Sequence, residues 1–221
     1  ALMDSDADTI PDVVECKDQV PCEDLDQDGH PNSLDIDSDG DGIVDAIEAV
    51  AWTSVTQTVA AANLVVELFP TEHRSRPANV DLVAQPLDSD GDGLPDYLDR
   101  DSDNDTVPDA IEGHDGNGDG QPDLVAQGVD RDGDGLDDSY DTFMSDTLDS
   151  QNALASSVAP PGQNGAAPYW RNPDDDGDGI PTADEIGDGP LDKNQNGIPD
   201  YLEPATLPLQ IYLPFILKAN D

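Results

Sequence analysis

The sequence has 221 residues, and its 51 Asp and Glu against 8 Lys and Arg give a formal net charge of -43. Such a charge would repel the phosphates of nucleic acid, which excludes that class of partner, and would hold an unorganised chain expanded. No apolar run reaches the roughly 18 residues that span a bilayer, so we expect no transmembrane segment.

The acidic residues recur in register. In the clearest copy, Asp37 to Glu48, side-chain oxygens fall at loop positions one, three, five, nine and twelve, with glycine at six. This spacing lets a short backbone surround a calcium ion with seven oxygens, one of them the carbonyl at position seven. Nine such copies, loops 1 to 9, run along the chain. The sequence therefore predicts up to about nine bound Ca²⁺ ions.

The predicted metal ligands are the oxygen-bearing residues at these five positions. In loops 1 to 3 they are Asp4, Asp6, Asp8, Asp12, Glu15, Asp24, Asp26, Asp28, Asn32, Asp35, Asp37, Asp39, Asp41, Asp45 and Glu48. In loops 4 to 7 they are Asp88, Asp90, Asp92, Asp96, Asp99, Asp101, Asp103, Asp105, Asp109, Glu112, Asp115, Asn117, Asp119, Asp123, Asp130, Asp132, Asp134, Asp138 and Asp141. In loops 8 and 9 they are Asp174, Asp176, Asp178, Glu185, Asp192, Asn194, Asn196, Asp200 and Glu203.

Loops 6 and 9 depart most from the pattern. Loop 6 has Ala126 at position twelve, and both loops contain amides, whose oxygens coordinate without bringing charge. We expect these two loops to bind calcium least tightly.

The spacing of the loops argues against EF-hands. Loops 2 and 3, and loops 4 and 5, begin thirteen residues apart, which leaves no room for the flanking helices of an EF-hand. Position eight is proline in seven loops, and proline lacks the amide hydrogen through which paired EF-hand loops are joined. The predicted fold class is a mostly irregular, calcium-wrapped repeat with few short β-strands, and not a helical EF-hand protein.

The closely spaced runs that begin at Asp88 (DSDGDGLPD) and Asp101 (DSDNDTVPD) resemble thrombospondin type-3 repeats, of which bacterial surface proteins carry similar arrays. The resemblance covers residues 4–48, 88–141 and 174–203. It implies calcium-wrapped backbone with little regular secondary structure, each ion bridging neighbouring turns. The chain lacks the one cysteine per repeat of the animal pattern and contains two long insertions.

The loops divide the chain into segments. We assign 1–48 to loops 1–3, 49–87 to an insertion with a strand-like apolar stretch, 88–141 to loops 4–7, 142–173 to a linker or extended arm, 174–203 to loops 8–9, and 204–221 to an apolar tail.

The two apolar segments are candidates for association. Residues 64–69 are predicted to form a strand, and Pro208 and Pro214 confine the tail to an edge strand or an extended docking segment. The tail would pair either with residues 55–69 of its own chain or, by strand addition, with a neighbouring subunit. We expect self-association through the tail and residues 55–69.

The sequence also indicates an extracellular protein. Cys16 and Cys22 are spaced to close a small disulfide, the alternative being two free thiols, and disulfides belong to oxidising compartments. The chain begins with Ala1 rather than Met, from which we expect a mature form whose signal peptide has been removed.

No catalytic motif is recognisable, the three histidines are expected at the surface, and we expect no enzymatic activity. The leading hypothesis is an extracellular, calcium-stabilised structural protein that assembles into a surface appendage or filament. The alternative is a monomeric, calcium-rigidified spacer or adhesion module of a larger cell-surface protein, which would contact a glycan or a host protein.

Overall fold

A computed structural model describes residues 3–6, 8–17, 19–49, 85–141, 167–187 and 191–204. The expected strand at 64–69, the linker over 142–166 and the tail over 205–221 lie outside these residues. Within them the helices are short and no strand occurs; the α-helices are α1 (Asp12–Glu15), α2 (Asp45–Glu48), α5 (Asp109–Glu112) and α7 (Thr182–Ile186), and the 3-10 helices are η1 (Asn32–Leu34), η2 (Asp96–Leu98), η3 (Tyr169–Arg171) and η4 (Asp200–Leu202). The described part of the chain is therefore no helical EF-hand bundle, and none of its helices is long and apolar enough to cross a membrane.

All nine loops share one backbone scheme. The amide of position nine donates to the carbonyl of the residue just before the loop, as from Asp45 to Ile36 (2.9 Å) and from Asp200 to Leu191 (2.7 Å). This bond closes each loop into a ring, and in loops 1 to 5, 8 and 9 a single helical turn follows at once. The repeat found in the sequence is thus also a repeat of conformation.

Proline at position eight fits this scheme. Pro108, for example, has φ -65° and ψ 143° and directly precedes α5, and its carbonyl accepts bonds from the amides of Ile111 and Glu112. The pyrrolidine ring fixes φ near this value, and the amide that closes the loop is that of position nine, so the missing amide hydrogen of proline is not needed. Proline therefore predisposes the chain to leave the loop and begin the turn.

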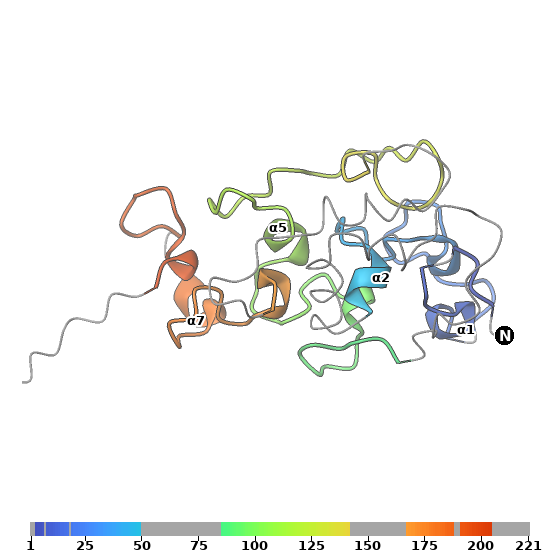
Figure 1. The fold of residues 1–221 in the computed structure, drawn as a ribbon, viewed down its shortest axis with the longest axis horizontal. Coiled ribbons are helices and arrows are strands. Elements are labelled where there is room, and N and C mark those ends of the chain that lie inside the picture. The colour runs from blue at the N-terminus through green and yellow to red at the C-terminus, as the bar shows by residue number, and fades with distance from the viewer. Residues whose placement is uncertain are drawn as a thin grey trace, which may run out of the picture.

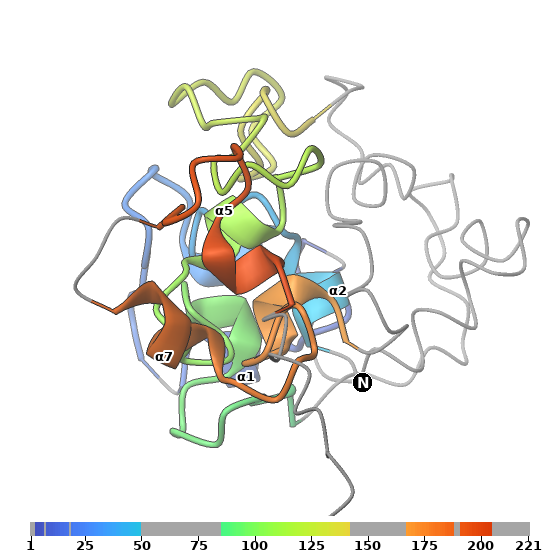
Figure 2. The same cartoon turned by 90° about the vertical axis from the view of Figure 1, so that its left-hand side faces the viewer.

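The four α-helical turns follow one another along the longest axis of the molecule, in the order α1, α2, α5, α7 (Figure 1). Seen from the end that carries α7, they are offset around this axis, with α5 above α1 and with α7 and α2 on opposite sides (Figure 2). Loops 1, 3 and 5, which contain the first three of these turns, form a column, and loop 8 with α7 follows at its end.

Loop 7 folds back onto loops 2 and 3. The amide of Ile36 donates to the carbonyl of Asp134 (3.1 Å), and His30 Nε2 lies 3.4 Å from a carboxylate oxygen of Asp130. Gly135 makes this approach feasible, because a Cβ at that position would lie 1.8 Å from an oxygen of Asp35. Loops nearly a hundred residues apart in sequence are therefore in contact.

The hydrophobic core is divided into two small clusters. One comprises Ile36, Ile43, Val44, Ile47, Leu136, Tyr140 and Trp170, and the other Ile10, Ala49, Tyr97 and Leu98. Ordering a residue costs about 1–2 kcal/mol, which clusters of this size cannot offset for the whole described chain. The folded state therefore needs a further stabilising contribution, which has to come from interactions within the loops.

The histidine expectation is wrong at one position. His114 is only 5% exposed and stacks on Tyr140 with ring centroids 4.4 Å apart. Gly42 packs against both rings, since a Cβ there would lie 2.6 Å from His114 Nε2. Burial lowers the pKa of His114 to about 4, so the ring is neutral and acts as a packing element between loops 3, 6 and 7.

Position six of every loop has a positive φ, from +74° at Gly120 to +112° at Gly29. Two loops place a β-branched residue there: φ is +92° at Thr9 and +84° at Thr106. A side chain on Cβ is strained in this region, whereas glycine is not.

We predict that Thr106→Gly stabilises the calcium-loaded protein by about 1 kcal/mol, the relief of strain less the entropic cost of glycine. The exposed Thr106 side chain has little packing to lose. Thr106→Ala keeps the Cβ and should gain much less. Urea midpoints in saturating calcium would measure both, and an equal gain from alanine would contradict the strain argument.

Candidate metal centres

Loop 3 shows how each loop orients its carboxylates. One oxygen of Asp37, Asp39 and Asp41 accepts a hydrogen bond from the loop backbone: Gly42 N–H donates to Asp37 (3.0 Å), Asp41 N–H to Asp39 (3.1 Å) and Ile43 N–H to Asp41 (2.7 Å). Each of these bonds fixes a rotamer and leaves the second oxygen of the same carboxylate free. The sequence spacing alone builds this arrangement, because every bond lies within the loop.

The second oxygens of loop 3 are buried and have no hydrogen-bond donor. They belong to Asp37, Asp39 and Asp41, and both carboxylate oxygens of Glu48 share the same condition. All four side chains are at most 2% exposed. Burying unpaired carboxylates is very costly, so the arrangement is stable only when a cation, or protons, occupies the space between them.

The donor set fits calcium. Asp37, Asp39 and Asp41 each offer an oxygen, and these atoms lie within 4.8 Å of one another. Oxygens at about 2.3–2.6 Å from one calcium ion can be about this far apart, and calcium accepts only hard oxygen ligands of this kind. The clustered Asp and Glu side chains can therefore hold metal ions, in agreement with the expected Ca²⁺.

Loops 1 and 5 repeat this pattern. In loop 1 both oxygens of Glu15 and one oxygen of Asp8 are buried without a donor, and in loop 5 the same holds for Glu112 and Asp103. Further groups that could hold an ion are Asp4, Asp6 and Asp8 in loop 1 and Asp24, Asp26 and Asp28 in loop 2. The buried, donor-free oxygens concentrate in the column formed by loops 1, 3 and 5.

Position nine has a role that its place in the pattern did not predict. Both carboxylate oxygens of Asp45 accept bonds from Ser38, one from the amide (2.8 Å) and one from the hydroxyl (2.6 Å). The same carboxylate lies within 4.8 Å of ligand atoms of Asp8 and Glu15 in loop 1. Asp45 therefore stiffens its own loop and adds negative charge to the site of loop 1.

The outer loops differ from the column. In loop 9 the side-chain amides of Asn194 and Asn196 donate to the two oxygens of Glu203, at 2.7 and 2.6 Å. In loop 6 the amide of Asn117 donates to Asp123 (2.7 Å). In loop 9 these donors satisfy the carboxylate of position twelve, which lacks a donor in loops 1, 3 and 5. In both loops the amide groups are engaged within the loop, which is in keeping with weaker ion binding.

One functional side chain was missed in the sequence. Arg171 is 7% exposed, and its Nε donates to the carboxylate of Asp96 at 2.6 Å. The guanidinium also lies 4.1 Å from the ring centroid of Trp170 and donates to the carbonyl of Glu48. Nothing in the loop pattern marks Arg171, because it precedes loop 8 and acts on loops 3 and 4. It supplies a fixed positive charge inside an acidic molecule.

The same burial shifts the carboxylate pKa values upward. Burial, followed by the charges of neighbouring carboxylates, raises the pKa of Glu15 to about 10, and burial raises that of Asp35 to about 8. The folded, metal-free chain would therefore bind protons that the unfolded chain, with ordinary carboxyl pKa values near 4, does not. Proton binding by these groups therefore stabilises the metal-free fold fully below about pH 4. This contribution to the free energy of unfolding is lost as the pH rises toward the folded-state pKa values of about 8 and 10.

We accordingly predict opposite pH responses with and without calcium. In excess chelator, near-ultraviolet circular dichroism should show more order at pH 5 than at pH 8, since protons then occupy the carboxylates. In calcium the order should instead decrease from pH 8 to pH 5, because protons compete with the metal. A chelated chain that is better ordered at pH 8 would contradict these pKa shifts.

The two cysteines are joined, with the disulfide between Cys16 and Cys22 closing the segment after α1. Comparisons with known proteins give no further guidance: no family model, no curated protein and no solved structure matches this chain.

Proposed function

We propose that this chain is an extracellular, calcium-stabilised structural protein built from loops of the thrombospondin type-3 kind. The observation that carries the proposal is the column of loops 1, 3 and 5. Its centre holds buried carboxylate oxygens without donors, among them both oxygens of Glu15, Glu48 and Glu112. Carboxylates buried in this way are stable in their charged form only when cations lie between them along the column.

The role of the metal is to hold the chain together. Each ion would be held by carboxylates of one loop, and a residue of another loop, such as Asp45 at loop 1, links successive sites. The described loops are arranged along one long axis (Figure 1), and filled sites would make this arrangement rigid. The loop carboxylates are accounted for as ligands, and we assign none of them a catalytic role.

The extracellular location is supported by calcium demand and by the disulfide. Loops of this type in extracellular modules bind with dissociation constants of about 10⁻⁴–10⁻³ M, which requires the millimolar calcium found outside cells. The bond between Cys16 and Cys22 belongs to an oxidising compartment.

We further propose that the protein self-associates into a surface appendage or filament. The support comes from the sequence: the apolar tail from Leu207 to Leu217 and the stretch 55–69 are the segments suited to strand addition.

Light scattering of the intact chain in millimolar calcium and in excess EDTA tests this assembly. Large particles in calcium that dissociate in EDTA, and folded monomers after deletion of residues 205–221, are the expected results. Polymers that survive the deletion would refute the role of the tail. A monomer in both solutions would favour the spacer or adhesion module instead.

A further inference from the structure

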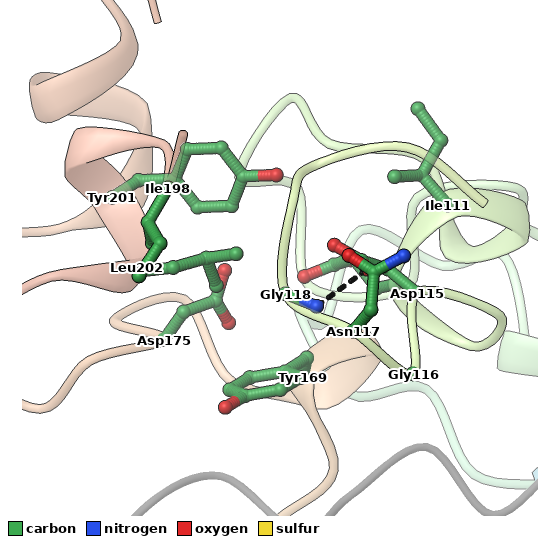
Figure 3. Close-up of a pocket in the computed structure, with 11 residues that line it drawn as sticks. Ile111, Asp115, Gly116, Asn117, Gly118, Tyr169, Asp175, Ile198, Tyr201 and Leu202 are labelled. Carbon is green, nitrogen blue, oxygen red and sulfur yellow. Dashed lines mark hydrogen bonds between the residues drawn. The ribbon is translucent and has the colours of Figure 1, made fainter. Parts of the chain in front are cut away.

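A cavity of about 290 Å³ separates loops 5 and 6 from loops 8 and 9. Figure 3 shows Tyr169, Asp175 and Tyr201 along one side of it and the turn from Asp115 to Gly118 along the other. Glu112, the last ligand of loop 5, also lines it. The cavity therefore opens directly onto the predicted ion site of loop 5.

Asp175 is an unusual residue in this cavity. It occupies position two of loop 8, which is not a ligand position of the repeat and is serine in loops 3, 4 and 5. The side chain is 1% exposed, and neither of its carboxylate oxygens has a hydrogen-bond partner of normal geometry. The nearby Thr182 hydroxyl acts on both Asp175 and Asp105, and its one proton cannot satisfy two carboxylates. A buried carboxylate without a donor requires a positive partner.

The neighbours of Asp175 are other carboxylates. Glu112 is 4% exposed, both its oxygens also lack donors, and Asp175 is the strongest of the negative charges that act on it. After burial, the charges of Asp105 and Asp103 in loop 5 are the largest factors that raise the pKa of Asp175, to about 9. Arg171, the basic residue nearest in sequence, forms its ion pair with Asp96.

Loop 8 is fastened to loop 5 at this point. The amide of Asp175 donates to the hydroxyl oxygen of Thr182 (3.1 Å), and Thr182 is fully buried. A hydrogen bond from the Thr182 hydroxyl lowers the pKa of Asp105, and one from the backbone amide of Asn172 lowers that of Asp103, each against the larger rise caused by burial. Three residues of one segment thus meet three predicted ligands of loop 5, and Asp175 is held in place rather than free to turn to solvent.

We propose that Asp175 is a ligand that loop 8 supplies to the divalent cation of loop 5, so that this one ion ties the two loops together. The ligand set is all oxygen and anionic, which selects a hard cation of the calcium class. The inference rests on the proposed calcium loading of loop 5. It adds that the C-terminal loops are joined to the column through a metal ion and not through packing alone.

Asp175→Asn tests the proposal, with Asp184→Asn as matched control. Asp184 lies in the same loop but is exposed, so the control makes the same change of charge outside the cavity. In calorimetric titrations of the metal-free chain, Asp175→Asn should weaken one calcium site by about tenfold or more, and the control should not. At calcium levels that half-saturate the wild type, hydrogen exchange should increase in residues 101–112 and 172–187 together.

Asp175→Ser, which introduces the residue of loops 3 to 5, separates a ligand from a packing role. A lost ligand is compensated by raising calcium ten- to hundredfold, which should return the exchange of both segments to that of the wild type. Exchange that is raised only in 172–187, or that calcium does not restore, would overturn the proposal. If the wild type binds no calcium, the proposed function itself fails; normal binding with an unaffected Asp175→Asn variant overturns this inference alone.

Discussion

Glu48→Gln should abolish most of the calcium binding of loop 3 and destabilise the folded protein by up to about 3 kcal/mol. Glu48 is fully buried, and both its carboxylate oxygens face the site without a donor. An amide offers one neutral oxygen in place of two charged ones. With a dissociation constant of about 10⁻⁴ M, about 10 mM calcium stabilises a fold by about 2.7 kcal/mol per site, and this contribution is what the variant loses.

The matched control for this prediction is Glu203→Gln, the same substitution at the same position of loop 9. Glu203 is only partly buried, and its oxygens already accept bonds from two asparagine side chains. We expect a change below about 1 kcal/mol there. Thermal unfolding in about 10 mM calcium would compare the two variants. Equal losses of stability would contradict the claim that the buried, donor-free carboxylate of loop 3 binds calcium more tightly than that of loop 9.

Arg171→Met should destabilise the protein by about 3–5 kcal/mol, although Arg171 lies outside the ligand set. Methionine replaces the packing volume but leaves the buried carboxylate of Asp96, 1% exposed, without its positive partner. It also removes the bond to the carbonyl of Glu48 and the contact with the ring of Trp170. Denaturant unfolding in saturating calcium would measure the loss.

Arg131→Met provides the comparison for this charge. Arg131 forms an ion pair with Asp138 (2.8 Å), but its side chain is 63% exposed, and exposed pairs contribute at most about 1 kcal/mol. A result in which both arginine variants lose the same stability would contradict the claim that Arg171 is an internal structural charge.

The local structure of the loops could be predicted from the sequence because it is determined within twelve residues. The carboxylates at positions one, three and five bond to amides at most five residues away, as from Gly42 to Asp37, so spacing alone specifies them. The absence of long helices followed from the thirteen-residue interval for the same reason. Position four was overlooked: it also has positive φ, as at Gly40 (+75°) and Asn104 (+59°), and the glycines found there in five loops were the available signal.

The relations between loops could not be predicted in this way. The approach of Asp45 to loop 1, of loop 7 to loop 2 and of Asp175 to loop 5 joins residues 30 to about 100 positions apart. These contacts depend on which faces of the loops meet in the folded chain, and nothing in a repeated ligand pattern distinguishes one neighbour from another. His114 and Arg171 escaped notice for the same reason, since a lone histidine or arginine shows its burial only in the assembled structure.

The central claim is that calcium binding and folding are one event, and chelation tests it most directly. Near-ultraviolet circular dichroism at pH 7.5 would be recorded in millimolar calcium, after excess EDTA and after calcium is restored. The account predicts loss of the folded signal in EDTA and its full return with calcium, because the buried carboxylates cannot remain unpaired at that pH. A spectrum and a melting temperature that are indifferent to EDTA would contradict it.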